Sequence, residues 1–341
     1  MVFRNVLITG GAGFIGSHLA EALLRDGSNV TIIDDLSTGQ WQNIDHLQQN
    51  PDFRAIIASA SDRQLIFDEV AKHDFVYHLA SAVGVKLIIE QPVKTVESIF
   101  HTTDVVLGAC SRFRRPVLIT STSEVYGKSV QVPFREEDDV VMGPTEKRRW
   151  AYACAKALDE FLGLAHYYET NLPVYLVRLF NTVGARQSSQ YGMVLPNFVR
   201  QALSKQPLTV YGNGQQRRCF CSVLDVVDGL MKLPRVAEAA GHVVNLGSQE
   251  EISIEALAQR VIQACQSSST IEFIPYAEAY GPGFDDMLRR VPSLERAQRY
   301  IGWNPKYDLN QIIGQVIESV SQGPTGAQDE CEGEPRCVQP S

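Results

Sequence analysis

Long hydrophobic runs, excess positive charge and regular cysteine pairs are all missing from this 341-residue sequence. No apolar run reaches the roughly 20 residues that a membrane-spanning helix needs, so no membrane insertion is expected. The formal net charge is −8, which argues against general attraction to nucleic acid or to anionic membranes. The chain enters a predicted strand almost at once, and no signal peptide is indicated. These absences favour a cytoplasmic protein in which local arginines or backbone amides meet any anionic ligand.

Cysteine is scarce and irregularly spaced. The seven cysteines are odd in number and scattered through apolar sequence, so we expect reduced thiols rather than a disulfide framework. Cys219 and Cys221 have the spacing of two metal ligands, but no second Cys or His pair at zinc spacing accompanies them. Packing in the core is therefore the favoured interpretation, and no metal site is predicted.

The most informative stretch is a glycine-rich turn at residues 7–16. The apolar run 6–8 predicts a buried strand, and apolar residues at helical spacing begin at residue 17. Gly10 permits a tight turn, Gly13 lets the backbone approach a pyrophosphate, and Gly16 lets the helix pack closely on the strand. The free N–H groups at the start of that helix then face the phosphates. The predicted cofactor-binding residues of this turn are Gly10, Gly13, Phe14, Ile15 and Gly16.

A second predicted strand, residues 30–33, ends in Asp34 and Asp35. A carboxylate about 20 residues beyond such glycines grips the ribose hydroxyls of a bound dinucleotide. Because a 2′-phosphate would be repelled by Asp34, the sequence favours NAD over NADP.

Residues 1–120 alternate apolar runs with helical patterns. The expected strands are residues 6–8, 30–33, 55–57, 75–79 and 117–119, and the expected helices are residues 17–26, 62–72 and 93–113. This alternation predicts an α/β fold with a doubly wound parallel sheet of the Rossmann type, whose ligand lies at the carboxyl ends of the strands. The fourth strand ends at Leu79 and Ala80, where small residues leave room for the cofactor backbone; tight packing is an equal alternative.

The fifth predicted strand is followed by Thr122, Ser123 and Glu124, so hydroxyls and a carboxylate lie on the ligand side. Further along, residues 150–162 have a strong helical pattern that puts Tyr152 and Lys156 on one face. A lysine ammonium beside a phenol stabilises the phenolate, so we expect a lowered pKa for Tyr152. A tyrosine with this pKa can take a proton from a sugar hydroxyl as hydride leaves the same carbon.

Together these motifs resemble the extended short-chain dehydrogenase/reductases that modify nucleotide sugars. The resemblance covers about residues 3–320 and continues through the motifs at residues 178–184, 208–218, 244–247 and 302–305. It implies NAD as the cofactor, a UDP-sugar as the favoured substrate, and cofactor contacts for Tyr152 and Lys156. It also implies that Asn181 donates to a phosphate oxygen, that Tyr211 lies in the nucleotide segment, and that Arg218 and Arg290 neutralise the diphosphate.

Enzymes of this family oxidise carbon 4 of the hexose, and three outcomes then remain open: 4-epimerisation, 4,6-dehydration, or decarboxylation where carbon 6 is a carboxylate. Glu124 discriminates between them, because an epimerase needs no acid or base beyond the tyrosine. A glutamate at this place resembles UDP-glucuronate decarboxylases and GDP-mannose 4,6-dehydratases, and Thr122 would hydrogen-bond the reacting oxygen. Motifs around residues 209–211 and 244–251 favour the decarboxylases, so UDP-glucuronate decarboxylation to UDP-xylose is the leading hypothesis.

The chain departs from the decarboxylase pattern in several places. Those enzymes have a Pro- and Tyr-rich loop after the fourth strand, whereas residues 82–90 here offer Lys86 as a charged substrate contact, with a solvent-facing lysine as the alternative. Ile99 stands where the family often has asparagine, and Ser59 where an adenine-binding aspartate is common. Two readings from other classes are a non-catalytic NAD-binding sensor and a reductase of small carbonyls. Intact Tyr152, Lys156 and Glu124 argue against the sensor, and the diphosphate segment around Arg218 argues against the reductase.

The expected domains are discontinuous. An NAD-binding domain comprises residues 1–182, 223–248 and 306–320, and a smaller α/β nucleotide-sugar-binding domain comprises residues 183–222 and 249–305. Residues 323–341 form a tail with no apolar periodicity, which we expect to be disordered. The helical segments at residues 93–113 and 150–170 carry apolar residues beyond one face, which suggests a homodimer built on a helix pair.

Overall fold

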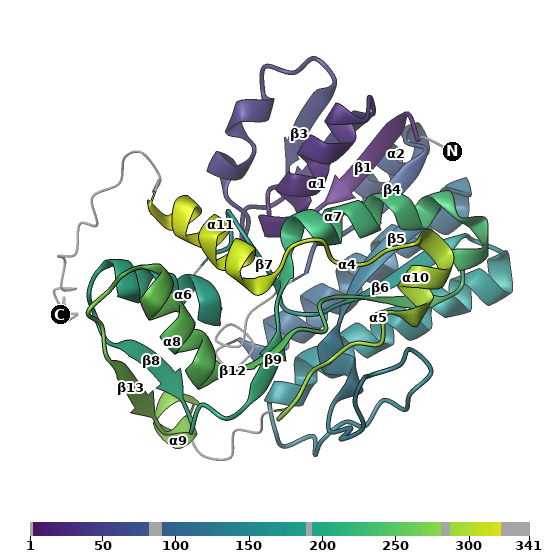
Figure 1. Ribbon diagram of the computed structural model, residues 1–341. Helices are drawn as coiled ribbons and strands as arrows, with labels where there is room; N and C mark the ends of the chain where they lie inside the picture. Colours follow the sequence, from purple (N-terminus) through teal and green to yellow (C-terminus); the bar gives the residue numbers. More distant parts are fainter. Residues whose placement is uncertain (1–2, 82–90, 189–192, 281–286, 322–341) are drawn as a thin grey trace, which may run out of the picture.

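Seven parallel strands form the central sheet of this computed structural model, which describes residues 3–81, 91–188, 193–280 and 287–321 (Figure 1). The strand order is β11-β6-β5-β4-β1-β2-β3. The strands are β1 (Asn5–Thr9), β2 (Asn29–Asp34), β3 (Phe53–Ile57), β4 (Phe75–His78), β5 (Val117–Thr122), β6 (Val174–Leu179) and β11 (Val243–Leu246). Strand order reverses between β1 and β4, and a crevice for ligands opens at the carboxyl ends of the strands at such a point.

Helices cover both faces of this sheet because its strands are apolar on both sides. Val6 and Ile8 of β1 pack in one cluster with α1 and α7, whereas Leu7 between them packs in another with α2 and α4. The helices of the sheet domain are α1 (Phe14–Arg25), α2 (Arg63–Lys72), α4 (Pro92–Phe113), α5 (Arg149–Thr170), α7 (Val223–Lys232) and α10 (Glu295–Ile301). Successive residues of a strand thus pack on opposite faces of the sheet, and helices bury both faces. This is the doubly wound fold that the sequence predicts.

A smaller α/β unit lies beside the carboxyl ends of the sheet (Figure 1). Its elements are α6 (Val194–Leu203), β8 (Leu208–Tyr211), α8 (Ile254–Ala264), β13 (Ile271–Ile274), α9 (Tyr276–Tyr280) and α11 (Leu309–Ser321). Strands β8 and β13 run parallel, with Leu208 opposite Ile271. Short strand pairs lie in and next to this unit: β7 (Thr182–Val183) with β10 (Cys221–Ser222), and β9 (Arg217–Cys219) with β12 (Glu251–Ser253). Single-turn 3₁₀ helices complete the description: η1 (Trp41–Asn43), η2 (Asp45–Leu47), η3 (Ser123–Tyr126), η4 (Leu233–Arg235) and η5 (Ala237–Ala239).

Two segments pack with a different unit from the one expected. Residues 306–320 were assigned to the NAD-binding domain, but Ile312 and Val316 of α11 are buried in the small unit's apolar cluster, against α6 and α8. Residues 249–305 were assigned wholly to the substrate domain, but Ala297 and Trp303 pack in the cluster under α1 and α7. Periodicity shows that a helix has an apolar face, but not which neighbour covers that face, and this explains both differences.

The predicted strands and helices of the first 120 residues are confirmed, with shifts of a few residues at their ends. The stretch 82–90 with Lys86, and the expected tail, lie outside the described residues. In the ranges that the structure describes, no helix is both long and apolar enough to cross a membrane. The five cysteines in those ranges are all free thiols.

Candidate active site

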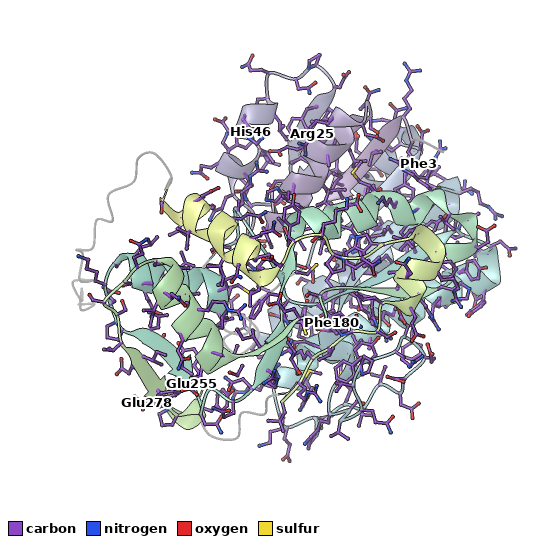
Figure 2. The ribbon with its side chains drawn as sticks, viewed as in Figure 1. Phe3, Arg25, His46, Phe180, Glu255 and Glu278 are labelled. Carbon is purple, nitrogen blue, oxygen red and sulfur yellow. The ribbon has the colours of Figure 1, made fainter. Side chains whose placement is uncertain are left out.

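A cavity of about 1540 Å³ is lined by the carboxyl ends of the sheet strands and by the small unit. All the site residues singled out from the sequence line it, apart from Lys86, which is outside the described ranges. They come from positions as far apart as Gly10 and Arg290, so folding brings together residues that are scattered through the sequence. Figure 2 marks the sheet side at Arg25 and His46, the small unit at Glu255 and Glu278, and Phe180 toward the middle of the molecule.

The glycine turn forms a cradle that side chains would fill. A Cβ at Gly10, whose φ is +75°, would lie 2.7 Å from the backbone nitrogen of Ala80, and one at Gly16 would lie 2.1 Å from the carbonyl oxygen of Gly10. Helix α1 starts at Phe14, and Gly13 at its N-cap provides no side-chain hydrogen bond. The first N–H groups of α1 are therefore not capped by that residue and border the cavity, as an anion-binding helix terminus requires.

Asp34 is held rigidly at the end of β2. One of its carboxylate oxygens accepts from the backbone N–H of Ala12 and the other from that of Leu36, each at 2.9 Å. Burial raises the pKa of Asp34, and these two backbone donors oppose the rise. The carboxylate is thus fixed beside the glycine turn, while Asp35 next to it also lines the cavity.

Tyr152 and Lys156 both border the cavity from α5, but their electrostatics correct the sequence-based expectation. Burial raises the pKa of Tyr152, and the nearby carboxylates of Glu124 and Asp159 raise it further. The Lys156 Nζ donates to Asp159 Oδ2 at 2.8 Å, so its charge is opposed by a buried carboxylate. The expected lowering of the Tyr152 pKa is therefore not found, because burial raises this pKa and Asp159 opposes the charge of Lys156.

Glu124 lies between two arginines. Its Oε1 accepts from Arg290 Nη1 at 3.3 Å and lies 3.7 Å from Arg149 Nη2. The three side chains are at most 14% exposed, so these charges interact with little solvent between them. Thr122, at the N-cap of η3, accepts from the Glu124 backbone N–H at 3.2 Å. This hydrogen bond fixes the backbone from which the Glu124 side chain extends. Ser123 is buried at the same wall of the cavity.

Arg149 was missed in the sequence. It stands three residues before Tyr152, one helical turn away, so the helical spacing that paired Tyr152 with Lys156 could have found it. The resemblance predicts Arg290 at the diphosphate; in the structure its Nη1 donates to Glu124 Oε1 at 3.3 Å, and a contact with a diphosphate stays a prediction.

The other predicted substrate residues also line the cavity, after the end of β6 and on β8 and β9. Arg218 is buried, and its Nη1 donates to the carbonyl of Arg217 at 2.8 Å. Asn181 donates through Nδ2 to the carbonyl of Cys219 at 2.9 Å, which ties the end of β6 to β9. Gln216 donates to the Tyr211 carbonyl at 2.9 Å. Aromatic residues that the sequence did not indicate, Phe220 and Tyr276, also border the cavity.

A buried polar network supports the wall that carries Glu124. Arg178 of β6 makes a bidentate ion pair with Glu160, at 3.0 and 2.7 Å, and Ser121 donates to the same carboxylate. The Arg178 guanidinium also lies 4.6 Å from the centre of the Tyr126 ring, and Tyr126 donates to Asn245 at 2.8 Å. Because these charges are buried and paired, the network fixes η3 relative to α5.

The glycine turn, the acid at the end of β2 and the Tyr–Lys pair on one helix define a site of the extended short-chain dehydrogenase/reductase class. Within that class, the chain belongs to the GDP-mannose 4,6 dehydratase family, whose model matches residues 7–316.

Two curated relatives are similar over most of the chain. A UDP-N-acetyl-alpha-D-glucosaminuronate decarboxylase of Bacillus cytotoxicus is 38% identical over 316 residues, which is 92% of this chain and 97% of the relative. UDP-glucuronic acid decarboxylase 4 of Arabidopsis thaliana is 37% identical over 324 residues, which is 95% of this chain and 70% of the relative.

Among solved structures, the UDP-glucuronic acid 4-epimerase of Bacillus cereus in complex with UDP-glucuronic acid and NAD superposes with a TM-score of 0.84. It is 25% identical, and the match covers 94% of this chain and 99% of the epimerase.

Proposed function

We propose that this protein is an NAD-dependent UDP-glucuronate decarboxylase that forms UDP-xylose and carbon dioxide through a 4-keto intermediate. The observation that carries the proposal is the charge around Glu124. Arg149 and Arg290 place two guanidinium groups in the cavity wall beside Glu124. A substrate carboxylate at carbon 6 would interact favourably with these guanidinium groups, whereas the neutral hydroxymethyl group of a hexose would not.

The cofactor assignment rests on the cradle described above. The glycine backbone at residues 10–16, the uncapped start of α1 and the fixed carboxylate of Asp34 fit a dinucleotide with a free ribose 2′-hydroxyl. When bound, NAD supplies the reversible hydride acceptor for carbon 4. The solved epimerase of the same fold holds NAD together with UDP-glucuronic acid, which supports this reading.

The chain's own groups then handle protons and the carboxylate. Tyr152 takes the proton of the sugar 4-hydroxyl as that carbon is oxidised, and it returns the proton when the ketone is reduced. The ketone at carbon 4 lets the bond between carbons 5 and 6 break, with its electron pair delocalised onto the carbonyl oxygen. Carbon dioxide leaves, and carbon 5 gains one proton, so the net reaction consumes UDP-glucuronate and one proton.

A second substrate is favoured by one specific observation, the 38% identity to a decarboxylase of an N-acetylated uronate. Both substrates carry the same carboxylate and differ at carbon 2. The charge pattern around Glu124 therefore fits either of them, and the choice between them needs a direct comparison.

The test is to incubate the purified protein, without added dinucleotide, with UDP-glucuronate and separately with UDP-N-acetylglucosaminuronate. We expect loss of the mass of carbon dioxide from at least one of them, measured by mass spectrometry. UDP-glucose, which has no carboxylate, is the matched control and should be left unmodified. Interconversion of UDP-glucose and UDP-galactose would instead support the 4-epimerase alternative.

We further propose that the protein is a homodimer through α4 and α5. These adjacent helices carry exposed apolar side chains, with Val93 and Phe161 each 68% exposed and Leu158 47% exposed. A second copy would cover such a surface. We expect Phe161→Glu to convert a dimer to a monomer in sedimentation equilibrium, with Phe273→Glu on the small unit as the control. A wild-type protein that sediments as a monomer would contradict the proposal.

A further inference from the structure

Lys156 belongs to a buried polar chain that the proposed chemistry leaves unexplained. Its Nζ donates to Asp159 Oδ2 at 2.8 Å, and the two side chains are 3% and 0% exposed. Asp159 Oδ1 is also buried and has no hydrogen-bond partner within the described residues. A buried carboxylate is costly unless it is paired, and the charge that pairs with Asp159 is that of Lys156, on the same helix as Tyr152.

The row of buried polar side chains continues from Asp159 away from the cavity and into the sheet. Thr103 of α4 interacts with the Asp159 carboxylate and lowers its pKa, against the rise that burial causes. The Thr103 hydroxyl also lies 3.0 Å from His78 Nε2, and His78 Nδ1 lies 2.7 Å from the Thr9 hydroxyl. All of these side chains are at most 1% exposed. This row of polar side chains thus ends at Thr9, beneath the glycine turn, and does not reach bulk water.

Helix α4 faces the tyrosine with an apolar residue and faces the aspartate with a polar one. Ile99 packs against Tyr152 and Ala155, and Thr103 lies one turn further along the same helix. The hydrogen-bonding group that α4 offers to this region therefore meets Asp159 and not the phenol.

We propose that Asp159 is a positioning residue that holds Lys156 in place and, by opposing the lysine's charge, sets the pH at which Tyr152 can act as a base. The inference rests on the proposed role of Tyr152. The other groups that face the pair are Glu124 of η3, Glu160 of α5, Thr103 of α4 and His78 of β4.

The charges of Lys156 and Asp159 determine in which direction the ionisation of Tyr152 changes when Asp159 is replaced. With Asp159 ionised, the Lys156–Asp159 pair is neutral as a whole, and Tyr152 has little net positive charge to stabilise its phenolate. Burial lowers the pKa of His78 to about 3, so this ring stays neutral and adds no charge at working pH. Removing the Asp159 charge therefore makes the Tyr152 phenolate easier to form.

The experiment compares wild type with Asp159→Asn, which keeps the size of the side chain and removes its charge. Tyrosinate formation is followed by ultraviolet difference absorbance as the pH is raised, and the same titration with Tyr152→Phe added to each background isolates the signal of Tyr152. We expect Tyr152 to ionise at a pH lower by about one unit or more in Asp159→Asn, the size of effect of one nearby charge. The acidic limb of the pH profile of kcat/KM should move in the same direction.

Asp228→Asn is the matched control, because Asp228 makes an ion pair with Lys232 at the same 2.8 Å distance on the partly exposed helix α7. It should leave both readouts unchanged. If Asp159→Asn does not fold, Asp159→Ser, which also removes the charge, serves in its place, and we expect a displacement in the same direction. A Tyr152 midpoint that stays in place or rises would overturn the proposal and leave Asp159 a structural partner only.

The spectroscopic titration needs no substrate. Its failure would therefore leave the proposed decarboxylation intact, whereas failure to release carbon dioxide would leave the titration result standing.

Discussion

At the scale of single residues, the site combines groups whose charges cannot be understood one at a time. Glu124 is the clearest case, because Arg149 and Arg290 both approach the same carboxylate oxygen. Tyr152 is another, since burial and two carboxylates raise its pKa while its lysine neighbour is paired elsewhere. The bound cofactor's positive charge would favour the phenolate in a way that the chain alone does not.

The role of Tyr152 as the base gives the first prediction. Tyr152→Phe removes only the hydroxyl, so turnover should fall by about 100-fold or more while the amount of NAD that purifies with the protein stays the same. Steady-state kinetics and the absorbance of released dinucleotide measure the two quantities. Turnover equal to that of wild type would remove this residue from the proton-transfer step.

Arg149 is expected to bind the substrate carboxylate. Arg149→Gln should raise KM for UDP-glucuronate by about 10- to 100-fold, the range for losing a hydrogen bond to a charged group. The affinity for UDP should not change, because UDP lacks that carboxylate and Arg218 remains. Isothermal titration with UDP provides the comparison. An equal loss of affinity for UDP would mean that Arg149 acts on the diphosphate or on the fold.

At the scale of elements, the turn between β1 and α1 determines where the cavity lies. Gly16, in the first turn of α1, lies against the turn that follows β1. Because it has no Cβ, the Gly10 carbonyl can lie directly against α1. The register of β1 with β2 and β4 then places Asp34 and Ala80 around the same turn. Three elements that are adjacent in the sheet thus form the cofactor end of the cavity.

Gly16→Ala tests this close approach. The added methyl group would lie 2.1 Å from a backbone oxygen that cannot move without displacing the turn, so we expect loss of retained NAD and a lower melting temperature. Gly314→Ala on α11 is the control, since nothing lies within 4 Å of its Cβ position. That change should stabilise the protein or leave it unaffected, because alanine favours helix by up to about 1 kcal/mol. Retention of NAD by Gly16→Ala would show that the turn does not bind it.

The elements also show how far sequence alone could predict this molecule. Glycine spacing, the acid after β2 and the Tyr152–Lys156 pair could be predicted because each depends on local spacing along the chain. Arg149 and Asp159 lie within one turn of that pair, so spacing marks both as candidates. Charged residues on a helix are usually solvated, however, and only the structure shows that these two are buried. The side that α11 covers depends on long-range packing, which periodicity does not encode.

At the scale of the whole molecule, buried histidines link stability to pH. Burial lowers the pKa of His78 to about 3, and burial also lowers those of His73 and His18. Below about pH 6.5 the unfolded chain binds protons at these positions, whereas the folded protein does not until the pH approaches the lowered values. These three histidines therefore contribute a decrease in the free energy of unfolding as the pH falls through this window.

The contribution of His78 to the pH dependence of the free energy of unfolding can be measured. His78 alone should reduce the free energy of unfolding by about 2 kcal/mol between roughly pH 6.5 and 5, at about 1.4 kcal/mol per pH unit. Urea denaturation at the two values measures the change, and His78→Asn should show a weaker dependence. A His78→Asn variant whose free energy of unfolding has the same pH dependence as that of wild type would contradict the burial of this ring.

The proposed decarboxylation takes place in one cavity, and an isotope label follows that reaction directly. UDP-glucuronate labelled with ¹³C at carbon 6 is incubated with the purified protein and no added dinucleotide, and both gas and nucleotide products are analysed by mass spectrometry. We predict labelled carbon dioxide and unlabelled UDP-xylose in equal amounts. Formation of UDP-galacturonate with the label retained would contradict the account and identify the protein as a 4-epimerase.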